Sequence, residues 1–318
     1  MRVFVAGATG VVGRRLLPLL AERGHDVVAT TRNPARRDGL RASGARAVVM
    51  DGLDPAAVGE AVARAEPEVI VHQMTALAGF DDIKHFDRGF AATNELRTHG
   101  LDNLLAAADA VGVRRLVAQS FTGWPNERSG GPVKSEEDPL EPDPPAQQRR
   151  SLAAIRYLEQ AVTTAALEGL ALRYGSLYGP GTSLADEYAR LIRERKLPLV
   201  GDGGGIWSFL HADDAAAATA LAVERGDPGV YNVVDDEPAP VAEWLPYLAE
   251  VLGAPRPRHV PGWLARFAIG EVGVEMMTRI RGAANAKARR ELGFSPVWAS
   301  WREGFRDGLL DRPLRSAA

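Results

Sequence analysis

The strongest constraint on the fold lies near the start of the chain, where an apolar run meets three glycines. Residues Arg2–Ala6 have the composition of a strand, Gly7–Gly13 read Gly-Ala-Thr-Gly-Val-Val-Gly, and Val12–Arg23 carry apolar residues at helical spacing. Glycines in such a turn bend the chain, let a diphosphate approach the backbone and let the helix pack on the strand. Free N–H groups at the helix start then bind the anion. The segment therefore predicts a dinucleotide-binding turn rather than a bare tight turn.

The alternation of strand and helix continues through the first half of the chain. Strands are expected at Asp26–Ala29, Ala47–Met50, Val69–His72, Arg115–Gln119 and Ala171–Tyr174, with helices at Pro55–Ala65, Ala91–Val111 and Leu152–Leu167. Strands that alternate with helices form parallel sheets covered on both faces. This order predicts an α/β fold, a Rossmann-type doubly wound parallel sheet.

The second half of the chain is less regular and predicts a smaller C-terminal substrate-binding lobe. Helices are expected at Ser183–Glu194, Ala212–Val223, Val241–Leu252 and Ser300–Leu310, and a strand at Val230–Val234. We expect residues 1–175, with about 205–235, to form the dinucleotide-binding domain. Residues 176–204 and 236–318 then form the substrate-binding lobe.

Composition excludes several classes of protein. The 318 residues include 38 Lys+Arg and 41 Asp+Glu, for a net charge of -3, which argues against a nucleic-acid partner. The chain has no cysteine, so disulfides, zinc-thiolate sites and a cysteine nucleophile are excluded, and its six histidines lack metal-ligand spacing. No apolar run approaches the roughly 20 residues that span a bilayer. We expect a cytoplasmic protein with no metal and no membrane partner.

The second strand indicates which dinucleotide is bound. NAD-binding folds place a carboxylate at its end for the ribose 2′-hydroxyl, but this strand ends in Thr31-Arg32. Thr31 and Arg32 suit a 2′-phosphate, and Arg36 and Arg37 add positive potential. The pattern favours NADP(H) over NAD(H), unless these arginines are only a solvated helix start. Asp51 suits the adenine edge or a helix cap.

A proline-rich segment from Phe121 to Pro145 follows the strand expected at Arg115–Gln119. Long irregular segments in compact domains are usually functional or disordered, and ligands bind at this end of such sheets. We expect a lid, with a solvated loop as the alternative. An acidic cluster at Glu136–Asp138 beside Lys134 is expected to be solvated rather than catalytic.

The order of these motifs resembles the extended short-chain dehydrogenase/reductase family, the NAD-dependent epimerase/dehydratase group. The resemblance runs nearly end to end and is carried by Gly7–Gly13, Val69–His72, Thr93-Asn94, Leu116–Ser120, Leu172–Gly181, Phe209–Asp214, Tyr231–Val234 and Glu291–Pro296. It implies a set of residues near the cofactor: Gly7, Thr9, Gly10, Val11, Val12, Gly13, Thr31, Arg32, Asp51, Gly52, Gln73, Met74, Thr75, Asn94, Ser120 and Tyr174.

The chain departs from the family at its catalytic pair. Members of the family use a Tyr-x-x-x-Lys pair, in which the lysine lowers the tyrosine pKa. No lysine lies four residues after a tyrosine here. Gln148 and Leu152 occupy the two positions in one register, and Ser151 and Ile155 in a shifted register. The sequence therefore resembles an atypical member of the family.

Four hydroxyl groups are candidates to replace the missing acid. They are Ser120, Thr122, Tyr174 and Tyr178. Ser120 matches the serine of the family's fifth-strand motif, and Phe121 occupies the usual catalytic Ser/Thr position. For Ser120 and Thr122, a structural hydrogen bond at the strand end is an equal alternative.

A second departure concerns the substrate. Members that act on nucleotide sugars carry an arginine where this chain has Trp207, and an indole cannot bind a diphosphate bidentately. Substrate contacts are expected from Phe121, Trp124, Gln148, Ser176 and Trp207, which suit an apolar or aromatic molecule unless they fill the core.

These observations predict an NADP(H)-dependent oxidoreductase acting on a carbonyl or alcohol of a small apolar or aromatic metabolite. A non-redox lyase or isomerase, or an NADP(H)-binding regulatory protein, are the alternatives. By analogy with the family, a homodimer through the helices at Ala91–Val111 and Leu152–Leu167 is possible.

Overall fold

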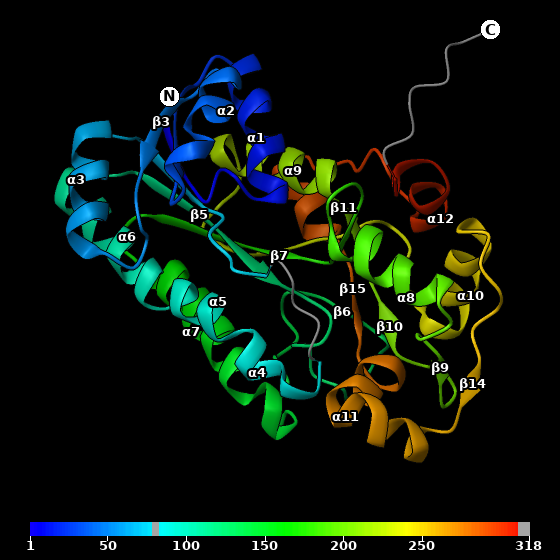
Figure 1. The fold of residues 1–318 in the computed structure, drawn as a ribbon. Helices are drawn as coiled ribbons and strands as arrows, with labels where there is room; N and C mark the ends of the chain where they lie inside the picture. The colour runs from blue at the N-terminus through cyan, green and yellow to red at the C-terminus, as the bar shows by residue number, and fades with distance from the viewer. Residues whose placement is uncertain (78–82, 311–318) are drawn as a thin grey trace, which may run out of the picture.

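The computed structural model describes residues 1–77 and 83–310. Its centre is a seven-stranded sheet in the order β12-β7-β5-β4-β1-β2-β3, in which every neighbouring pair is parallel (Figure 1). The strands are β1 Arg2–Ala6, β2 Asp26–Thr31, β3 Arg46–Val49, β4 Val69–His72, β5 Arg115–Phe121, β7 Glu168–Tyr174 and β12 Gly229–Val233. The predicted doubly wound sheet is confirmed.

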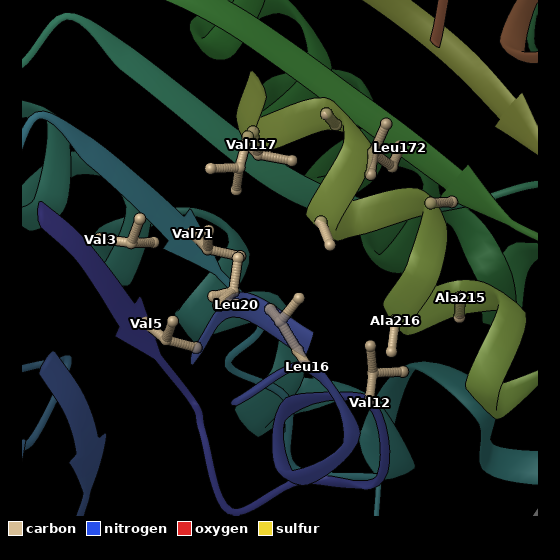
Figure 2. Packing of buried hydrophobic residues seen from close by; sticks show 14 of the residues in the cluster. Val3, Val5, Val12, Leu16, Leu20, Val71, Val117, Leu172, Ala215 and Ala216 are labelled. Carbon is tan, nitrogen blue, oxygen red and sulfur yellow. The ribbon is translucent and has the colours of Figure 1, made fainter. Parts of the chain in front are cut away.

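Helices cover both faces of this sheet. Helices α1 (Val11–Glu22) and α9 (Ala212–Glu224) share one face, and α3 (Pro55–Ala65), α6 (His99–Val111) and α7 (Arg149–Thr164) lie on the other. Because side chains alternate along a strand, Val3 and Val5 belong to the first core and Phe4 and Ala6 to the second. Figure 2 shows Val12, Leu16 and Leu20 of α1 between the valines of β1 and β4 and the alanines of α9.

The helix expected at Ala91–Val111 is interrupted. It forms α5 (Ala91–Arg97) and α6, separated by Thr98 with φ -103° and ψ -86°. The Thr98 hydroxyl donates to the Asn94 carbonyl at 2.9 Å and so competes with the helical ladder. The break gives α5 its own direction along α7. Helix α7 begins at Arg149, earlier than predicted, and ends before β7.

The C-terminal lobe packs against the carboxyl ends of the strands around a third core rich in aromatic residues. Its elements are β8 Ser176–Tyr178, α8 Ala189–Arg193, β9 Leu199–Val200, β10 Ile206–Trp207, β11 Phe209–His211, β13 Ala239–Pro240, α10 Val241–Val251, β14 His259–Val260, α11 Gly262–Thr278, β15 Gly282–Ala283 and α12 Trp301–Glu303. The expected helices at Ser183–Glu194 and Ser300–Leu310 contain π-helical turns at Leu184–Tyr188 and Gly304–Gly308. The exact division of the chain into two domains stays a prediction.

Further short elements are α2 Arg37–Ala42, α4 Phe86–Gly89 and β6 Val133–Lys134, the 3-10 helices at Pro34–Arg36, Ile83–His85 and Ala146–Gln148, and a π-helical turn at Ala288–Leu292. Helix α11 was missed from the sequence because Gly270, with φ +72°, interrupts its period. A glycine with positive φ resets the helical phase, so the apolar pattern does not continue through the helix.

The proline-rich segment after β5 is a packed connection rather than a lid or a solvated loop. Its strand β6 pairs with β15 of the C-terminal lobe. Lys134 is buried, donates to the Ser129 carbonyl at 2.7 Å and pairs with Asp138 at 3.3 Å. Glu136 accepts a hydrogen bond from the Asn232 N–H at 2.7 Å. Both expectations for this segment are therefore replaced by a fixed structural role.

Candidate active site

The three glycines of the β1–α1 turn have three different surroundings. Gly7 has φ +91°, and a Cβ there would lie 2.5 Å from the Gln73 backbone. A Cβ on Gly13 would lie 2.6 Å from the Gly7 carbonyl oxygen, so β1 and α1 need glycine to pack. A Cβ on Gly10 would meet only the Gly7 oxygen, at 3.4 Å, and would otherwise point into open space. That open space is where a bound diphosphate would approach the backbone.

The start of α1 leaves its first N–H groups available. Gly10 is the N-cap, no side chain caps it, and the first turn carries no acidic residue. The first intrahelical bond runs from Arg14 N to the Gly10 carbonyl. The N–H groups of Val11 and Val12 therefore point at the turn without a competing carboxylate. This donor set fits the diphosphate of a dinucleotide.

The end of β2 is cationic and exposed. Thr31 is buried, and its hydroxyl accepts a hydrogen bond from Asn33 N at 3.1 Å, which fixes the turn. Arg32, Arg36 and Arg37 are exposed, and none of them forms an ion pair with the described residues. Three unpaired guanidinium groups beside one strand end form a local site of positive potential.

The predicted adenine-side residues lie together beyond β3 and β4. Asp51 is exposed and accepts only from Leu53 N, at 3.1 Å, so one carboxylate oxygen stays free for a ligand. Gly52 is buried against the Met74 side chain, where a Cβ would clash with the sulfur. Met74 is therefore a packing residue at this point, and Thr75 is partly buried beside it.

Tyr174 does not fit the role of replacement acid. Its ring is fully buried, and its hydroxyl bonds Gln73 Nε2 at 2.8 Å and Thr219 Oγ1 at 2.5 Å. Burial raises the pKa of Tyr174 to about 12. The group holds β7 against α9 and Gln73, and it has no free proton to offer a substrate.

Ser120 is also committed to the protein interior. Its hydroxyl donates to Glu159 Oε1 at 2.7 Å, and Arg173 binds both oxygens of Glu159, each at 2.7 Å. All three side chains are buried. Arg97 is buried nearby, where burial lowers its pKa to about 10 in spite of the Glu159 charge. Ser120 thus belongs to a buried ionic network, in line with the structural alternative for this residue, and its catalytic role stays a prediction.

The other two hydroxyl candidates are buried as well. Thr122 donates to Asn126 Oδ1 at 3.1 Å, and Asn126 in turn bonds the Gly282 carbonyl. Tyr178 is fully buried, and burial raises its pKa. Its ring packs edge-on against Phe305, with centroids 5.3 Å apart, in the C-terminal core. The Thr122 hydroxyl is thus held by Asn126, whereas the Tyr178 hydroxyl lies in this core without a hydrogen-bond partner among the described residues.

In the first predicted register of the family's catalytic pair, the two positions carry one amide and one apolar side chain. Gln148 is 1% exposed, and both atoms of its amide lack a partner among the described residues. Leu152, one turn further along, is fully buried in the aromatic core. An unpaired buried amide is costly unless a ligand completes its hydrogen bonds. Gln148 is therefore the polar group best suited to meet a substrate.

Four aromatic side chains share the core of Leu152. Phe86 and Phe90 stack with centroids 4.3 Å apart, Trp124 meets Phe86 edge-on at 5.0 Å, and Phe121 lies 6.3 Å from Trp124. We call Phe86, Phe90, Phe121 and Trp124 the aromatic cluster. Sequence reasoning found Phe121 and Trp124 but missed the other two, although the i, i+4 spacing of Phe86 and Phe90 is a signal for a shared helix face.

A polar chain beside the aromatic cluster fixes the start of α7. Asp87 accepts from the N–H groups of Arg150 and Ser151 and from the Ser151 hydroxyl, the last at 2.6 Å. Asn94 donates to Ser151 Oγ at 3.1 Å, and its own Oδ1 lacks a partner. A carboxylate on the first N–H groups of a helix is a cap. Asp87 thereby holds Gln148 in place, a role no sequence motif announced.

Trp207 is a core residue rather than a substrate contact. It is buried, its indole N–H donates to the Met276 carbonyl at 2.9 Å, and its ring lies 5.0 Å from Trp244. These contacts favour the alternative that Trp207 fills the core. Ser176 is partly exposed, and its backbone N–H bonds Ser208. Its role as a substrate contact stays a prediction.

His72 at the end of β4 is neutral in the folded protein. Its Nδ1 accepts from Met74 N at 3.2 Å, so its proton sits on Nε2 and points at the Leu96 carbonyl. Burial, with the positive charge of Arg97, lowers the pKa of His72 to about 4.

This low pKa predicts a pH-dependent stability. Below about pH 6.5 the unfolded chain binds a proton that the folded chain refuses until about pH 4. The contribution of neutral, buried His72 to the free energy of unfolding is fully present above pH 6.5. It falls by about 3 kcal/mol as the pH drops towards 4. His72→Gln should remove this part of the slope in urea titrations between pH 7.5 and 4.5, whereas exposed His99→Gln should keep it. Equal slopes in all three proteins would contradict the assignment.

No cluster of metal-ligating side chains occurs within residues 1–77 and 83–310. In the same part of the chain, no helix has the length and apolar character needed to cross a bilayer.

Comparison with known proteins agrees with the fold and the turn. The model of the NAD dependent epimerase/dehydratase family matches residues 3–234. A 3-diazoavenalumate denitrifying reductase from a Streptomyces species is 47% identical over 309 residues, which are 96% of this chain and 99% of that protein. A 2-alkyl-3-oxoalkanoate reductase from Stenotrophomonas maltophilia is 29% identical over 322 residues, 96% of this chain and 93% of that protein.

A crystal structure with the same fold is the UDP-glucose 4-epimerase of Thermotoga maritima. It superposes with a TM-score of 0.76 over 97% of each chain at 20% identity. The matched family model includes the β1–α1 turn, all seven strands of the sheet and the strand-end residues described above. The chain is a member of the NAD dependent epimerase/dehydratase family.

Proposed function

We propose that the protein is an NAD(P)H-dependent reductase that removes a diazo group from a small aromatic substrate as N2. The observation that carries the proposal is the pairing of Gln148 and Leu152 where the family uses a proton-donating tyrosine and its lysine. The 47% identical relative with denitrifying reductase activity supports it.

The cofactor would be held by the residues of the β1–α1 turn. The N–H groups of Val11 and Val12 suit the diphosphate, and the free oxygen of Asp51 suits the adenine amino group. When bound, the nicotinamide supplies a hydride. The protein's own residues then need only bind the acceptor, orient it and exclude water.

The reaction balances without a proton donor. When an arenediazonium accepts a hydride, a C–H bond forms, the C–N bond breaks, and its electron pair leaves with N2. A carbonyl acceptor instead develops an alkoxide that needs a proton. The hydroxyls of Ser120, Thr122 and Tyr174 are held in protein hydrogen bonds. Tyr178 is buried in the C-terminal core. The site therefore suits the first reaction better than the carbonyl reduction expected from sequence.

The residues around Gln148 also suit a flat, cationic acceptor. The aromatic cluster offers apolar faces for an arene ring, and an aromatic face attracts a cation. Leu152 stands where the family has a lysine, so no ammonium charge lies at this position to repel a diazonium group. The amide of Gln148 can direct its carbonyl dipole at the positive nitrogen.

We expect Gln148→Leu to change substrate turnover without lowering stability. Removing an unpaired buried amide should leave the free energy of unfolding unchanged or higher. The value of kcat/KM should fall about tenfold because the substrate loses the carbonyl dipole that faces its positive nitrogen. Urea denaturation and steady-state kinetics measure the two effects. Gln147→Leu, an exposed neighbour, is the matched control. A variant that loses stability and keeps kcat/KM would place Gln148 in the core instead.

We also propose a preference for NADP(H), supported by Arg32. Arg32→Ala should weaken NADPH binding by at least about tenfold and NADH binding by less than about twofold, since one charge-assisted contact to the 2′-phosphate is lost. Arg41→Ala, on the same exposed stretch but paired with Asp38, is the control. Calorimetric titration of both cofactors measures the change. Equal losses for NADPH and NADH would remove the phosphate assignment.

The test of the proposed function compares two acceptors on the same ring. Purified protein and NADPH are mixed with 3-diazoniobenzoate or with 3-formylbenzoate, and Gly10→Val measures direct reduction by free NADPH. We expect N2 and benzoate from the first, with deuterium from [4-2H]NADPH on the ring carbon. Without a proton donor the aldehyde should react about 10²–10⁴-fold more slowly.

Two results would overturn the proposal. Comparable turnover of the aldehyde would restore carbonyl reduction. Tight cofactor binding with no oxidation of NADPH by either acceptor would favour a non-redox enzyme or a regulatory protein.

A further inference from the structure

An exposed apolar patch lies on the first half of α11. Trp263 is 71% exposed, Phe267 78% and Leu264 47%, the first two being among the most exposed large apolar side chains described. The helix lies at the rim of the molecule, orange in Figure 1, and contacts the short turn at Ile83–His85. We call Trp263, Leu264 and Phe267 the α11 patch. A contiguous exposed cluster of this kind marks an interaction surface.

The segment that carries the α11 patch is rich in positive charge. Residues 253–270 contain Arg256, Arg258 and Arg266 and no acidic residue, although the whole chain has a net charge of -3. Arg256 and Arg258 are exposed and form no ion pair with the described residues. Lys84 adds a fourth cation, since its Nζ donates to the Phe267 carbonyl at 2.8 Å. Glu271 pairs with Arg266 at 2.7 Å and compensates the charge of that arginine.

The same half-helix has an inner face that belongs to the core. Ala265 is buried and Ile269 partly buried in the hydrophobic core that contains Phe86 and Trp124. The kink at Gly270 lets this half take its own direction, so Trp263 and Phe267 stay outside. The outer residues are therefore a surface in their own right and not an exposed end of the core.

We propose that the α11 patch binds the surface of an anionic lipid bilayer. Aromatic side chains flanked by arginine suit the boundary between headgroups and acyl chains, and cations add attraction to anionic lipid. An apolar protein partner would explain the patch but not the surrounding cations. The contact is peripheral.

The experiment is co-sedimentation with vesicles at low and physiological salt. We expect the protein to bind vesicles of equal phosphatidylglycerol and phosphatidylcholine, and to bind pure phosphatidylcholine at least about tenfold more weakly. Binding should fall about fivefold for each of Arg256→Gln and Arg258→Gln. The Trp263→Ser/Phe267→Ser double variant should lose binding. The control Val297→Ser, which replaces a side chain that is 79% exposed outside the α11 patch, should keep it.

Three outcomes overturn the proposal. They are no binding to anionic vesicles at low salt, binding that survives the double variant, or self-association through the patch in sedimentation velocity without vesicle binding. NADPH affinity, measured on each variant, is expected to be unchanged. Because these variants should bind NADPH normally, the reductase assay in solution tests the proposed function independently of vesicle binding.

Discussion

Gly10→Val is expected to abolish dinucleotide binding while the protein stays folded. The valine side chain would occupy the open space beside the start of α1 and would keep the diphosphate from the N–H groups of Val11 and Val12. We expect the affinity for NADPH and NADH to fall at least about 100-fold, which corresponds to the loss of two charge-assisted hydrogen bonds. Equilibrium titration measures the affinity, and urea denaturation the stability.

Two other glycines supply the controls for this prediction. Gly59→Val lies in α3, where a Cβ meets nothing within 4 Å, and should keep full affinity. Gly13→Ala should instead lose stability, because its Cβ would sit 2.6 Å from the Gly7 oxygen. Retained affinity in Gly10→Val would mean that the turn does not bind the diphosphate.

Glu159→Ala is expected to destabilise the fold strongly. The substitution removes the carboxylate that binds Ser120 and Arg173 and leaves the guanidinium groups of Arg173 and Arg97 buried without compensation. Breaking a buried pair from one side costs about 3–5 kcal/mol. Denaturant unfolding should show a loss of this size in the free energy of unfolding.

A double substitution distinguishes an ionic network from simple packing. Glu159→Met/Arg173→Met should recover part of the loss, since no charge of that pair remains to be desolvated. Glu60→Ala, which breaks an exposed pair with Arg64 on α3, should change stability by about 0.5 kcal/mol or less. Additive losses at Glu159 and Arg173 would falsify the network.

The fold could be predicted from sequence because its signals are local. Strands β1 and β4 and helix α3 match the predicted bounds. Runs of β-branched residues mark the two strands, and Asp54 followed by proline marks the start of the helix. The helix break at Thr98 and the kink at Gly270 were not predictable in the same way. Each depends on the φ and ψ angles of a single residue, which its neighbours in the folded structure determine.

The candidate site was predicted less completely, for a physical reason. A motif shows which residues follow a strand, but not which face their side chains take. Ser120 and Tyr174 were expected to contact the substrate. Their hydroxyls instead form hydrogen bonds with residues distant in sequence, Glu159 and Thr219. The need for glycine at Gly7 and Gly13 was easier to predict, because it depends on the backbone of the turn itself. Its contact with a cofactor stays a prediction.

The edge strand β12 has a consequence for how copies of this chain could associate. Glu136 binds the outward N–H of Asn232, and Lys287 donates to the Val230 carbonyl at 2.9 Å while lying over the Tyr231 ring. Charged side chains thus occupy hydrogen-bonding groups that another strand would need. Growth of the sheet across molecules is blocked at this border, which protects the folded protein from strand-mediated aggregation.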